Sequence, residues 1–426
     1  MGMLRRLWVT AASAAMVTAG WAEDWPQWRG QHRDGTSTEV AGIADFPPAG
    51  LPVLWKAEVG AGWSSPVVVQ GKVYVLDARL QRPQAWERVT CRDVQTGKVL
   101  WQKEEAVPYP EFCFVAGQEN GPTSTPVVAG GNIYTLGQMG RVCCRSATTG
   151  ETLWQRDFRT DYGMKEFTGN ASLLVEGELL VVTMTGASGA CVVALDKQTG
   201  KEKWRALDEG ATNSSPMGVE TEGRRQIVVW TQQSVSWLDA VTGATLWSER
   251  LLTSTDKAVS TPVCEGRLLL VGGLMFRLND KEPGAQVLWP ENRAVSHRVL
   301  SHTSTAWLTG GHVYSARSSG EFVCLVALTG KEVWKTDRVT TPKQGATVHI
   351  IGSSSQAGTA LLYNDQGELI LVRLSPDGYE ERSRFRVLEP DQPFGGKKVN
   401  WSAPVLANGR VYVRNQREMV CVEVGR

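Results

Sequence analysis

The feature that most constrains the fold is a short motif, Thr-Gly with a tryptophan four residues after the glycine, which occurs five times. A looser copy has Gly284 and Trp289 one residue further apart, and another has Phe385 in place of the tryptophan. Trp55 lies in a similar final segment that lacks the Thr-Gly pair. The aromatic residues of these eight units are 42 to 53 residues apart. Self-similarity at such a period predicts a repeat architecture built from small supersecondary units.

Each unit also begins in a regular way. A small polar residue, often followed by proline, precedes an apolar run, as in Ser65-Pro66-Val67. A glycine-centred turn and an alternating apolar segment follow, as in 71–75. Proline is acceptable at the first residue of a strand, and the Thr-Gly pair supplies a turn residue that reaches positive φ. Because helical spacing of apolar residues is absent, we expect four short antiparallel strands in each unit.

A four-stranded sheet of ~45 residues cannot bury both of its faces alone, whereas a radial arrangement covers each sheet with its neighbours. The sequence therefore predicts an all-β fold, an eight-bladed β-propeller of four-stranded antiparallel blades. The last unit, about 402–424, lacks a final strand, and 51–59 is a final strand without a unit. We expect these N- and C-terminal strands to pair and close the ring. A tryptophan near the outside of a blade would bury ~150–250 Å² against the next blade. The residues expected in this docking role are Trp55, Trp101, Trp154, Trp204, Trp247, Trp289 and Trp334.

The first residues predict export. Arg5 and Arg6 precede an apolar stretch over 7–19, and small residues precede a cleavage point after Ala22. This pattern is typical of a signal peptide at 1–22, and the apolar run is shorter than the ~20 residues of a transmembrane anchor. We expect a periplasmic or secreted protein without a membrane span, and without a lipid anchor because the first cysteine is Cys91. A leading segment over 23–50 and a single propeller domain over 51–426 complete the expected organisation.

The charge balance excludes two classes of protein. The chain has 45 Lys and Arg residues against 44 Asp and Glu residues, which gives a formal charge of +1. Nucleic-acid binding and attachment to an acidic membrane surface both need a concentrated positive field. We expect neither function.

The repeat resembles that of a known family. The pattern Ala-x-Asp-x-x-Thr-Gly-x-x-x-Trp, clearest over 194–204, is similar to the tryptophan-docking repeat of pyrroloquinoline-quinone-like (PQQ-like) β-propellers. The segment Asp-Trp-Pro-Gln-Trp-Arg-Gly at 24–30 resembles the one that precedes blade one in quinoprotein dehydrogenases. The resemblance covers about 51–424 and implies eight blades. It implies either a quinone-dependent dehydrogenase or a cofactor-free scaffold, such as the propeller lipoprotein of the outer-membrane β-barrel assembly machinery.

The dehydrogenase alternative makes definite chemical demands. The quinone is a flat tricarboxylate that needs Arg or Lys partners, an aromatic face, a Ca²⁺ with oxygen ligands and an Asp general base. The segments that lead into the inner strands carry small neutral residues and a few aromatic residues, without a carboxylate or guanidinium. The sequence has no haem-attachment C-x-x-C-H motif and no recognisable metal or nucleotide motif. We therefore expect no cofactor, and pyrroloquinoline quinone with calcium only under the alternative.

The adjacent pair Cys143-Cys144 has two interpretations. The resemblance suggests a vicinal disulfide, which lies beside the cofactor in some quinone alcohol dehydrogenases. The repeat favours another interpretation, because Cys91, Cys144 and Cys324 all lie six residues before their Thr-Gly glycine, where the third unit has Ala194. A small buried strand residue satisfies such a position. The sequence leaves open the disulfide state of Cys113, Cys143, Cys144, Cys191, Cys264 and Cys421.

The function that these observations favour is an exported scaffold that binds another protein or a small polar ligand without catalysis. The alternative is a divergent PQQ-dependent dehydrogenase. We expect binding at the central funnel or on the loop-rich face, although the same side chains could simply hold turn backbones and the closed ring. No catalytic or metal-binding residue is expected. The candidate ligand-binding residues are Trp63, Asn120, Asn170, Asn213, His302, His349, Asn400 and Trp401.

Overall fold

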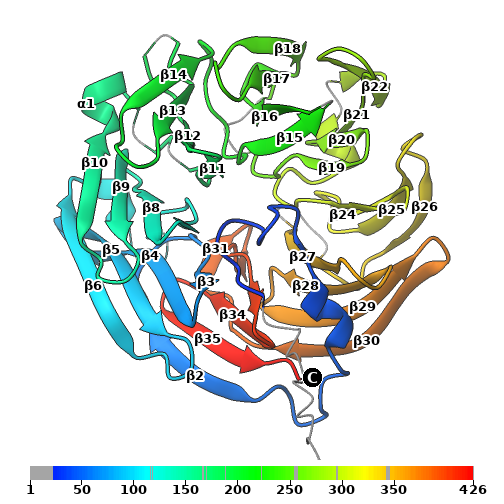
Figure 1. Cartoon of the computed structure of the whole chain (residues 1–426). Coiled ribbons are helices and arrows are strands. Elements are labelled where there is room, and N and C mark those ends of the chain that lie inside the picture. Colours follow the sequence, from blue (N-terminus) through cyan, green and yellow to red (C-terminus); the bar gives the residue numbers. More distant parts are fainter. Residues whose placement is uncertain are drawn as a thin grey trace, which may run out of the picture.

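The structure is a computed structural model that describes residues 23–425, except 116, 118, 166, 169, 188, 222, 254–257, 294–295 and 342–345. The expected signal peptide at 1–22 lies outside the described residues. Eight antiparallel sheets are arranged as blades around a central axis (Figure 1). The prediction of an eight-bladed β-propeller is therefore confirmed.

Each of the first seven blades has four strands that follow one another in the sequence, whereas blade eight takes its outer strand from the N-terminal end of the chain. The first strand of each blade lies next to the axis. Blade one consists of β3 (Val67–Val69), β4 (Lys72–Gln81), β5 (Gln84–Asp93) and β6 (Val99–Val107). Blade two consists of β7 (Val127–Ala129), β8 (Asn132–Leu136), β9 (Arg141–Ser146) and β10 (Thr152–Asp157). Blade three consists of β11 (Leu174–Glu176), β12 (Leu179–Thr183), β13 (Val192–Asp196) and β14 (Glu202–Ala206). Blade four consists of β15 (Met217–Thr221), β16 (Arg224–Trp230), β17 (Ser234–Asp239) and β18 (Thr245–Arg250). Blade five consists of β19 (Val263–Glu265), β20 (Leu268–Val271), β21 (Leu274–Leu278) and β22 (Ala285–Trp289). Blade six consists of β23 (Trp307–Thr309), β24 (His312–Ala316), β25 (Phe322–Val326) and β26 (Glu332–Thr336). Blade seven consists of β27 (Val348–Ser353), β28 (Thr359–Asn364), β29 (Glu368–Ser375) and β30 (Gly378–Arg386). Blade eight consists of β33 (Val405–Ala407), β34 (Arg410–Arg414), β35 (Glu418–Glu423) and β2 (Val53–Glu58).

The remaining elements are short and lie between the blades or before the first one. The sequence did not indicate them. They are β1 (Thr36–Ser37), which pairs with β27, the helical turns η1 (Thr38–Gly42), η2 (Glu111–Phe114), α1 (Phe158–Tyr162) and α2 (Ser296–Val299), and the hairpin of β31 (Gln392–Phe394) and β32 (Lys397–Val399).

Blade eight joins the two ends of the chain. Its outer strand β2 pairs antiparallel with β35, and Trp55 lies opposite Cys421. This pairing confirms the predicted closure of the ring. No Thr-Gly pair precedes Trp55, and Gly50, which has φ +89°, supplies the turn instead. A Cβ at Gly50 would overlap the ring of Phe385 of blade seven, so this glycine takes the place of a Thr-Gly glycine.

The tryptophans of the repeat pack on glycines of the next blade. A Cβ at Gly200 of blade three would lie 2.7 Å from Cε3 of Trp154 of blade two. The Nε1 of Trp154 donates a hydrogen bond to the main-chain oxygen of Lys197 at 3.0 Å. Because only glycine leaves room for the indole, the Thr-Gly pair of one blade and the tryptophan of another form a single contact. A Cβ would likewise lie 2.5–2.8 Å from the indole of the preceding blade at Gly97, Gly150, Gly243 and Gly330.

A β-bulge accompanies each docking tryptophan. In β14, Trp204 pairs with Ala194 and Glu202 pairs with Leu195, so that Lys203 has no partner of its own. A bulge bends a strand and re-aims the side chain beside it. The bulge therefore turns the indole from its own sheet toward the next blade. The same irregularity lies next to Trp55, Trp101, Trp154, Trp247, Trp289 and Trp334.

Hydroxyl groups link the inner ends of the blades. The N–H of Ser65 donates to Oγ1 of Thr125 at 3.3 Å, and the N–H of Thr125 donates to Oγ of Ser172 at 3.0 Å. A small hydroxyl residue at the opening of a unit thus ties one blade to another at several places around the axis. Further bonds of this kind join Ser172 to Ser215, Thr261 to Thr305, Val348 to Ser304 and Ala403 to Ser65.

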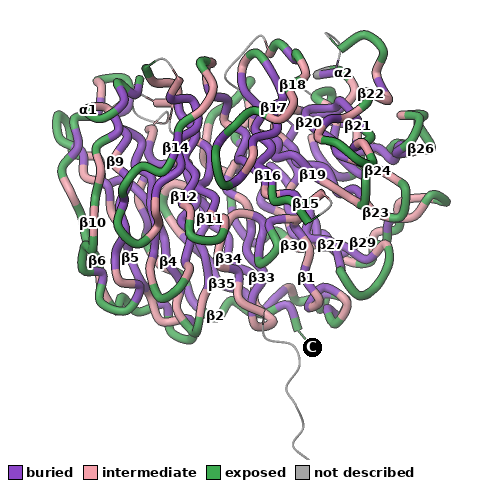
Figure 2. The backbone as a smooth tube through the Cα atoms, turned by 45° about the horizontal axis from the view of Figure 1, so that its top comes forward, coloured by how far each residue is buried: buried purple, intermediate pink, exposed green. Residues whose placement is uncertain are grey.

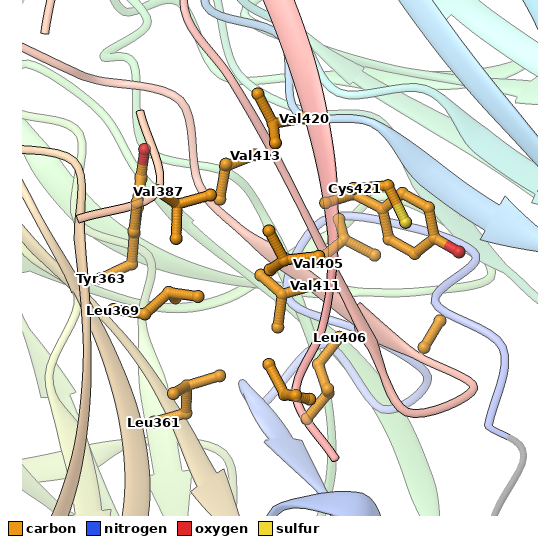
Figure 3. Close-up of a cluster of buried hydrophobic side chains, with 14 of the residues drawn as sticks. Leu361, Tyr363, Leu369, Val387, Val405, Leu406, Val411, Val413, Val420 and Cys421 are labelled. Atoms are coloured by element: carbon orange, nitrogen blue, oxygen red, sulfur yellow. The ribbon is translucent and has the colours of Figure 1, made fainter. Parts of the chain in front are cut away.

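The apolar core lies mainly between neighbouring blades. The strands are largely buried and the turns at both ends are exposed (Figure 2). One cluster joins blades seven and eight to the N-terminal part of the chain, and Leu361, Leu369 and Val411 belong to it (Figure 3). Because such clusters are separate, each interface stabilises mainly its own pair of blades.

We expect Gly200→Ala to destabilise the protein more than Gly409→Ala. Both glycines have φ +69°, so the two substitutions carry a similar backbone strain of roughly 1–2 kcal/mol. A Cβ at Gly409 meets nothing within 4 Å, whereas one at Gly200 meets Trp154. Overpacking should add about 1–3 kcal/mol to the loss in the free energy of unfolding, measured by urea denaturation. Equal losses in the two variants would show that the indole–glycine contact contributes nothing.

Candidate functional site

The propeller has two faces of different character. The loop face carries the segments that lead from the outer strand of one blade to the inner strand of the next. The turn face carries the Thr-Gly turns and the turns between first and second strands. Binding residues concentrate on loops that a rigid scaffold holds in place, so the loop face is the expected location of a site.

Residues 24–37, called the channel segment below, run through the centre of the ring. This dark-blue part of the chain lies among the inner strands in Figure 1. Trp25 and Val68 of blade one exchange main-chain hydrogen bonds of 2.7 and 2.9 Å, and Gly352 of blade seven donates to the Gly35 oxygen at 2.9 Å. The segment therefore contacts different sides of the channel. The cavity left beside it measures about 20 Å³, which is room for a single water.

Arg33 anchors the channel segment to blades three and four. Its side chain is buried, with 3% of the residue exposed. Nε donates to the Pro216 oxygen at 2.8 Å, and Nη1 and Nη2 donate to the oxygens of Leu173 and Ser172 at 2.9 Å each. Burial lowers the pKa of Arg33 to about 9, and the nearby Arg29 guanidinium adds to the lowering. The guanidinium group of Arg33 is therefore bonded to main-chain carbonyls and does not face a ligand site.

Trp28 and His349 meet inside the channel. The Nε1 of Trp28 donates to Oγ1 of Thr261 at 2.7 Å, and the indole lies edge-on to His349 with ring centroids 6.4 Å apart. Nε2 of His349 is 3.1 Å from the main-chain oxygen of Trp401. Burial lowers the pKa of His349 to about 4, against the opposing effect of this hydrogen bond. The ring is therefore neutral at pH 7, and Nε2 carries the proton because a carbonyl can only accept.

The structure brings four of the eight predicted binding residues together in two pairs. Nδ2 of Asn170 donates to Oδ1 of Asn213 at 2.9 Å. Oδ1 of Asn170 accepts from Nε2 of Gln138 at 2.6 Å, which makes a chain of amides at the loop-face ends of blades two to four. His349 and the main chain of Trp401 form the second pair.

The other four predicted binding residues are Asn400, His302, Trp63 and Asn120, and each has a hydrogen-bond partner of its own. A role of these residues in ligand binding stays a prediction. Asn400 donates to the Tyr363 hydroxyl at 2.6 Å, His302 Nε2 is 3.0 Å from the Gly272 oxygen, and the N–H groups of Trp63 and Asn120 donate to the oxygens of Pro122 and Cys113 at 2.9 and 3.4 Å.

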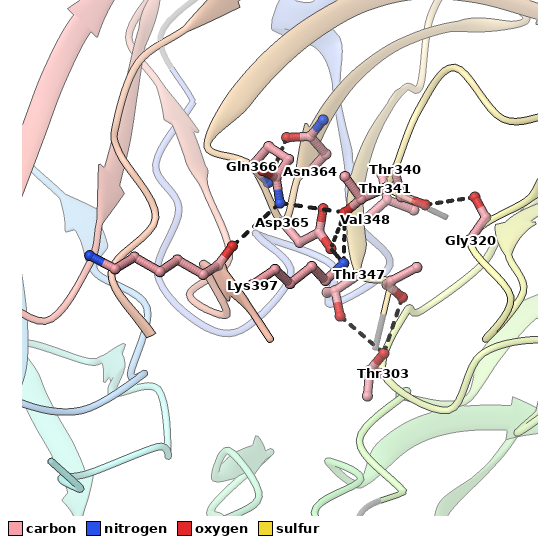
Figure 4. A network of polar contacts seen from close by, with 12 residues as sticks. Thr303, Gly320, Thr340, Thr341, Thr347, Val348, Asn364, Asp365, Gln366 and Lys397 are labelled. Atoms are coloured by element: carbon pink, nitrogen blue, oxygen red, sulfur yellow. Dashed lines mark hydrogen bonds and ion pairs between the residues drawn. The ribbon is translucent and has the colours of Figure 1, made fainter. Parts of the chain in front are cut away.

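The hairpin β31–β32 is held on the loop face by a buried ion pair. Nζ of Lys397 donates to Oδ2 of Asp365 at 2.9 Å and to Oγ1 of Thr341 at 2.6 Å. Asp365 is fully buried, and Figure 4 shows it within a network of threonines from blades six and seven. The ammonium group of Lys397 therefore balances the charge of the buried Asp365 carboxylate and is engaged in holding the hairpin.

A cleft of about 480 Å³ opens on the loop face between blades eight and one. It exists because the two blades differ in height. Strands β4, β5 and β6 have 9 or 10 residues, whereas β34, β35 and β2 have 5 or 6, so the upper part of blade one has no neighbour of equal length. The charged residues that line the cleft include Arg79, Arg88, Arg92, Glu119, Asp391 and Arg417.

The eight cysteines are free thiols, and all but the half-buried Cys264 are buried. Cys144 lies opposite Trp154, whereas Sγ of its neighbour Cys143 lies 4.0 Å from Nη2 of Arg145. Burial raises the pKa of Cys143 to about 12, so this thiol stays protonated and unreactive at neutral pH. The residues opposite the docking tryptophans are cysteines in four blades: Cys91, Cys144, Cys324 and Cys421.

The donor set does not fit pyrroloquinoline quinone with calcium. Among the described residues, no group of three or more His, Cys, Asp or Glu side chains could hold a metal ion. Arg29 and Arg33 in the channel donate to main-chain oxygens, and the channel segment occupies the centre of the ring. A tricarboxylate would need free cationic partners at such a place.

Trp28, Arg29 and Arg33 are not among the residues that the sequence predicts for the site. They precede the first repeat, in the segment expected only to lead into the propeller. The available signal is the run at 24–30, which has two tryptophans and an arginine outside any repeat unit. The cleft residues were also missed, because the height of a blade is set by pairing and not by its motif.

A family model described as outer membrane protein assembly factor BamB matches residues 85–336 and, in a second overlapping match, residues 188–384. The chain belongs to this PQQ-repeat family. The membership confirms the resemblance that the Thr-Gly…Trp pattern indicates.

Curated relatives of this PQQ-repeat protein have two kinds of name. An outer membrane protein assembly factor BamB from Alteromonas naphthalenivorans is 26% identical over 230 residues, which cover 50% of this chain and 54% of the relative. A quinohemoprotein alcohol dehydrogenase from Comamonas testosteroni is 25% identical over 208 residues, which cover 45% of this chain and 27% of the relative. The matched regions span about half of the relatives' length or less.

Solved structures share the propeller fold. The quinohemoprotein alcohol dehydrogenase from Comamonas testosteroni superposes with a TM-score of 0.64 at 14% identity, over 95% of this chain and 81% of that chain. BamB from Moraxella catarrhalis superposes with a TM-score of 0.57 at 14% identity, over 88% of this chain and 99% of that chain. Likeness at this identity shows the fold alone. Over the part of the chain that the structure describes, no helix is long and apolar enough to cross a membrane.

We expect Arg33→Met to lower the free energy of unfolding by about 3 kcal/mol, because it leaves three buried carbonyls without their charged donor. The measurement is urea denaturation of the full chain. Arg382→Met is the control, since Arg382 makes a rim ion pair with Asp45 and its loss should cost about 1 kcal/mol or less. Similar losses in both variants would show that the channel segment is not anchored by Arg33.

We expect the stability of the protein to fall below pH 6.5 through His349. The folded state keeps this ring neutral down to about pH 4, whereas the unfolded chain takes up a proton near pH 6.5. Unfolding therefore binds a proton between these values, and the free energy of unfolding should drop by roughly 2–3 kcal/mol from pH 7.5 to pH 4. His349→Asn should remove this part of the pH dependence in urea titrations, and the control His312→Asn should retain it. A pH profile that is unchanged in His349→Asn would contradict the assignment.

Proposed function

We propose that this PQQ-repeat propeller is an exported, non-catalytic scaffold that binds a protein partner on its loop face. The observation that carries the proposal is a set of exposed apolar side chains there: Phe112 is 52% exposed, Val115 46% and Phe394 39%. The free energy of the system falls when a partner removes exposed apolar groups of a protein surface from water. Aromatic residues are also enriched among the residues that contribute most to protein–protein binding.

These side chains belong to one continuous surface, called the aromatic patch below. Phe112 and Phe167 have ring centroids 5.0 Å apart, which joins the loops after blades one and two. Phe394 and Trp401 have centroids 5.2 Å apart, which joins the hairpin to the start of blade eight. The loop after blade one also reaches the hairpin, where a Cβ at Gly117 would lie 3.8 Å from Cγ of Pro393. The patch comprises Phe112, Val115, Phe167, Phe394 and Trp401.

The chemistry of the described residues supports binding in preference to catalysis. The Arg33 and His349 side chains in the channel are bonded within the protein, Arg33 to main-chain carbonyls and His349 to the main chain of Trp401. His349 also has its pKa lowered to about 4, so it is not poised to exchange a proton near pH 7. A scaffold needs rigidity and an accessible surface, and these features supply both.

The relatives support the same choice. Two BamB proteins named as outer membrane protein assembly factors match 50% and 37% of this chain. That name describes work with other proteins, which is the kind of partner proposed here. The signal peptide predicted at 1–22 supports export to the periplasm or out of the cell, where such a role would be performed.

The second candidate is a PQQ-dependent dehydrogenase, because quinoprotein alcohol dehydrogenases are also among the relatives. Under this alternative, cationic side chains would have to be released from their main-chain partners to bind the quinone. We therefore propose that this chain shares the fold of the dehydrogenases and not their activity.

A cross-linking experiment tests which face binds the partner. A photoreactive p-benzoylphenylalanine replaces Phe112 or Phe394 in cells that express the full chain, and Lys98 or Gln198 on the turn face serve as controls. Both patch positions should give the same adduct to one partner, and the turn-face positions should give none. Adducts of equal yield from both faces would contradict the proposal.

Reconstitution tests the second candidate. The purified chain is incubated with pyrroloquinoline quinone and Ca²⁺, and dye reduction is followed with alcohols and sugars. We expect no quinone-dependent dye reduction, because no described group of residues offers the required ligands. Tight quinone binding with substrate-dependent reduction would establish the dehydrogenase and reject the scaffold.

A further inference from the structure

We propose that the cleft between blades eight and one binds an extended peptide segment, which adds as a strand to the free inner edge of β4. The inference rests on the proposed function, since the peptide would belong to the protein partner. It goes further by naming the site and the conformation in which the partner is held.

The wall of the cleft is a half-buried part of a sheet whose side chains are bonded to one another. Cross-strand pairing places Arg79 opposite Trp86, and the guanidinium carbon of Arg79 lies 3.7 Å from the centroid of the indole ring. On the same side of the sheet, Arg88 binds the carboxylate of Asp77 with two hydrogen bonds of 2.7 and 2.9 Å. A volume of about 480 Å³ is also typical of ligand sites, which span ~300–1,000 Å³. The wall is therefore ordered before a ligand arrives.

The main chain of Leu80 is a free strand edge in this wall. Ala61 and Ala78 exchange two main-chain hydrogen bonds of 2.8 Å each, which adds Ala61 to the inner side of β4. In an antiparallel ladder, the N–H and C=O groups of residues two apart point to the same side, so those of Leu80 point to the side of Ala61. The chain turns away at Gly62, and within the described residues no main-chain partner replaces it. Leu80 itself lines the cleft.

Because arginines of the wall are paired with carboxylates, the cleft favours binding of a neutral peptide main chain over binding of a small anion. Arg88 is already paired with Asp77, and Nη2 of Arg79 lies 2.8 Å from Oε1 of Glu104. Two of the four arginines in the cleft are thus compensated in place. A phosphate or dicarboxylate would have to compete with these carboxylates, whereas a peptide backbone needs only the donors and acceptors of a strand edge.

Side chains at the rim supply contacts for a peptide with charges of both signs. Arg417 is exposed and forms no ion pair with a described residue, and the carboxylate of Glu119 on the loop after blade one is likewise unpaired in the described structure. Nη1 and Nη2 of Arg92 already donate to the main-chain oxygens of Gly97 and Glu58 at 3.0 and 2.8 Å. Acidic side chains of the peptide would therefore face Arg417, and a basic one would face Glu119.

The cleft continues into the aromatic patch. Gly117 and Gln392 line the cleft, and each belongs to a loop that also carries a residue of the patch. A partner that packs on Phe112 and Phe394 would therefore bring an adjoining segment to Leu80. The two surfaces together would hold one protein by an apolar anchor and an added strand.

The test uses a randomised library of capped nine-residue peptides on beads, selected on the full chain. Dissociation constants of the selected peptides are measured by fluorescence anisotropy. Gln102→Trp should weaken binding about tenfold or more, because the Gln102 side chain lines the cleft and the indole would fill it. Lys103→Trp is the matched control, since the next residue of β6 points to the other side of the sheet, and it should leave binding unchanged.

Backbone methylation of the peptides tests strand addition separately. N-methyl groups at alternating positions should weaken binding about tenfold, and N-methyl groups at the positions between them should be tolerated. Binding should also slow hydrogen exchange of the Leu80 amide. Peptides that bind equally to the wild type and Gln102→Trp, or that tolerate methylation everywhere, would overturn the proposal. Displacement of the peptides by inorganic phosphate or succinate would assign the cleft to anions instead.

The outcomes also separate this inference from the proposed function. If Phe112 and Phe394 give cross-links but the wild type selects no more peptide than Gln102→Trp does, the scaffold proposal is supported and the cleft assignment is wrong. If selected peptides bind the cleft while the patch gives no cross-link, the proposed docking face fails and the cleft assignment stands.

Discussion

The contact between an indole and a glycine of the next blade is the interaction on which the rest of the structure depends. The flat indole lies over the main chain of the glycine, where the Cβ of any other residue would overlap the ring. The N–H of the indole donates a hydrogen bond to a main-chain carbonyl of the neighbouring blade. A β-bulge beside each tryptophan aims it there. Because this contact fixes only the outer strands, the segments between blades are free to vary in length. The units can therefore differ by several residues without losing the ring.

A ring of inner strands leaves a channel lined by unpaired main-chain groups, and buried groups of this kind require partners. The channel segment supplies them. Trp25 pairs with blade one, β1 adds to β27, and Arg33 brings three donors to the carbonyls of blades three and four. The channel thus becomes part of the scaffold. The proposed partner-binding surface therefore lies outside it, on the loops that the ring holds in place.

The fold could be predicted from the sequence because the repeat is local: glycine and tryptophan are four residues apart, and counting the units gives the blades. The closure of the ring by the terminal strands was also predicted, but the individual residues that meet there were not. Gly50 packs against Phe385 and Cys421 lies opposite Trp55, and these partners are hundreds of residues apart in the chain. The site is less predictable still. Loop residues such as Asn400 were identified from their polarity, but polarity cannot distinguish a ligand contact from a bond to Tyr363.

The irregular parts of a repeat protein are the parts that the ring itself does not require. Here the tall blade one, the loop after it and the hairpin β31–β32 all depart from the repeat, and they adjoin one another at the cleft. Longer loops cost little free energy, because the entropy of closing a loop rises only slowly with its length. The docking contacts hold the ring whatever these segments do. Additions of this kind can therefore build a binding surface at one edge of the loop face while the indole–glycine contacts stay unchanged.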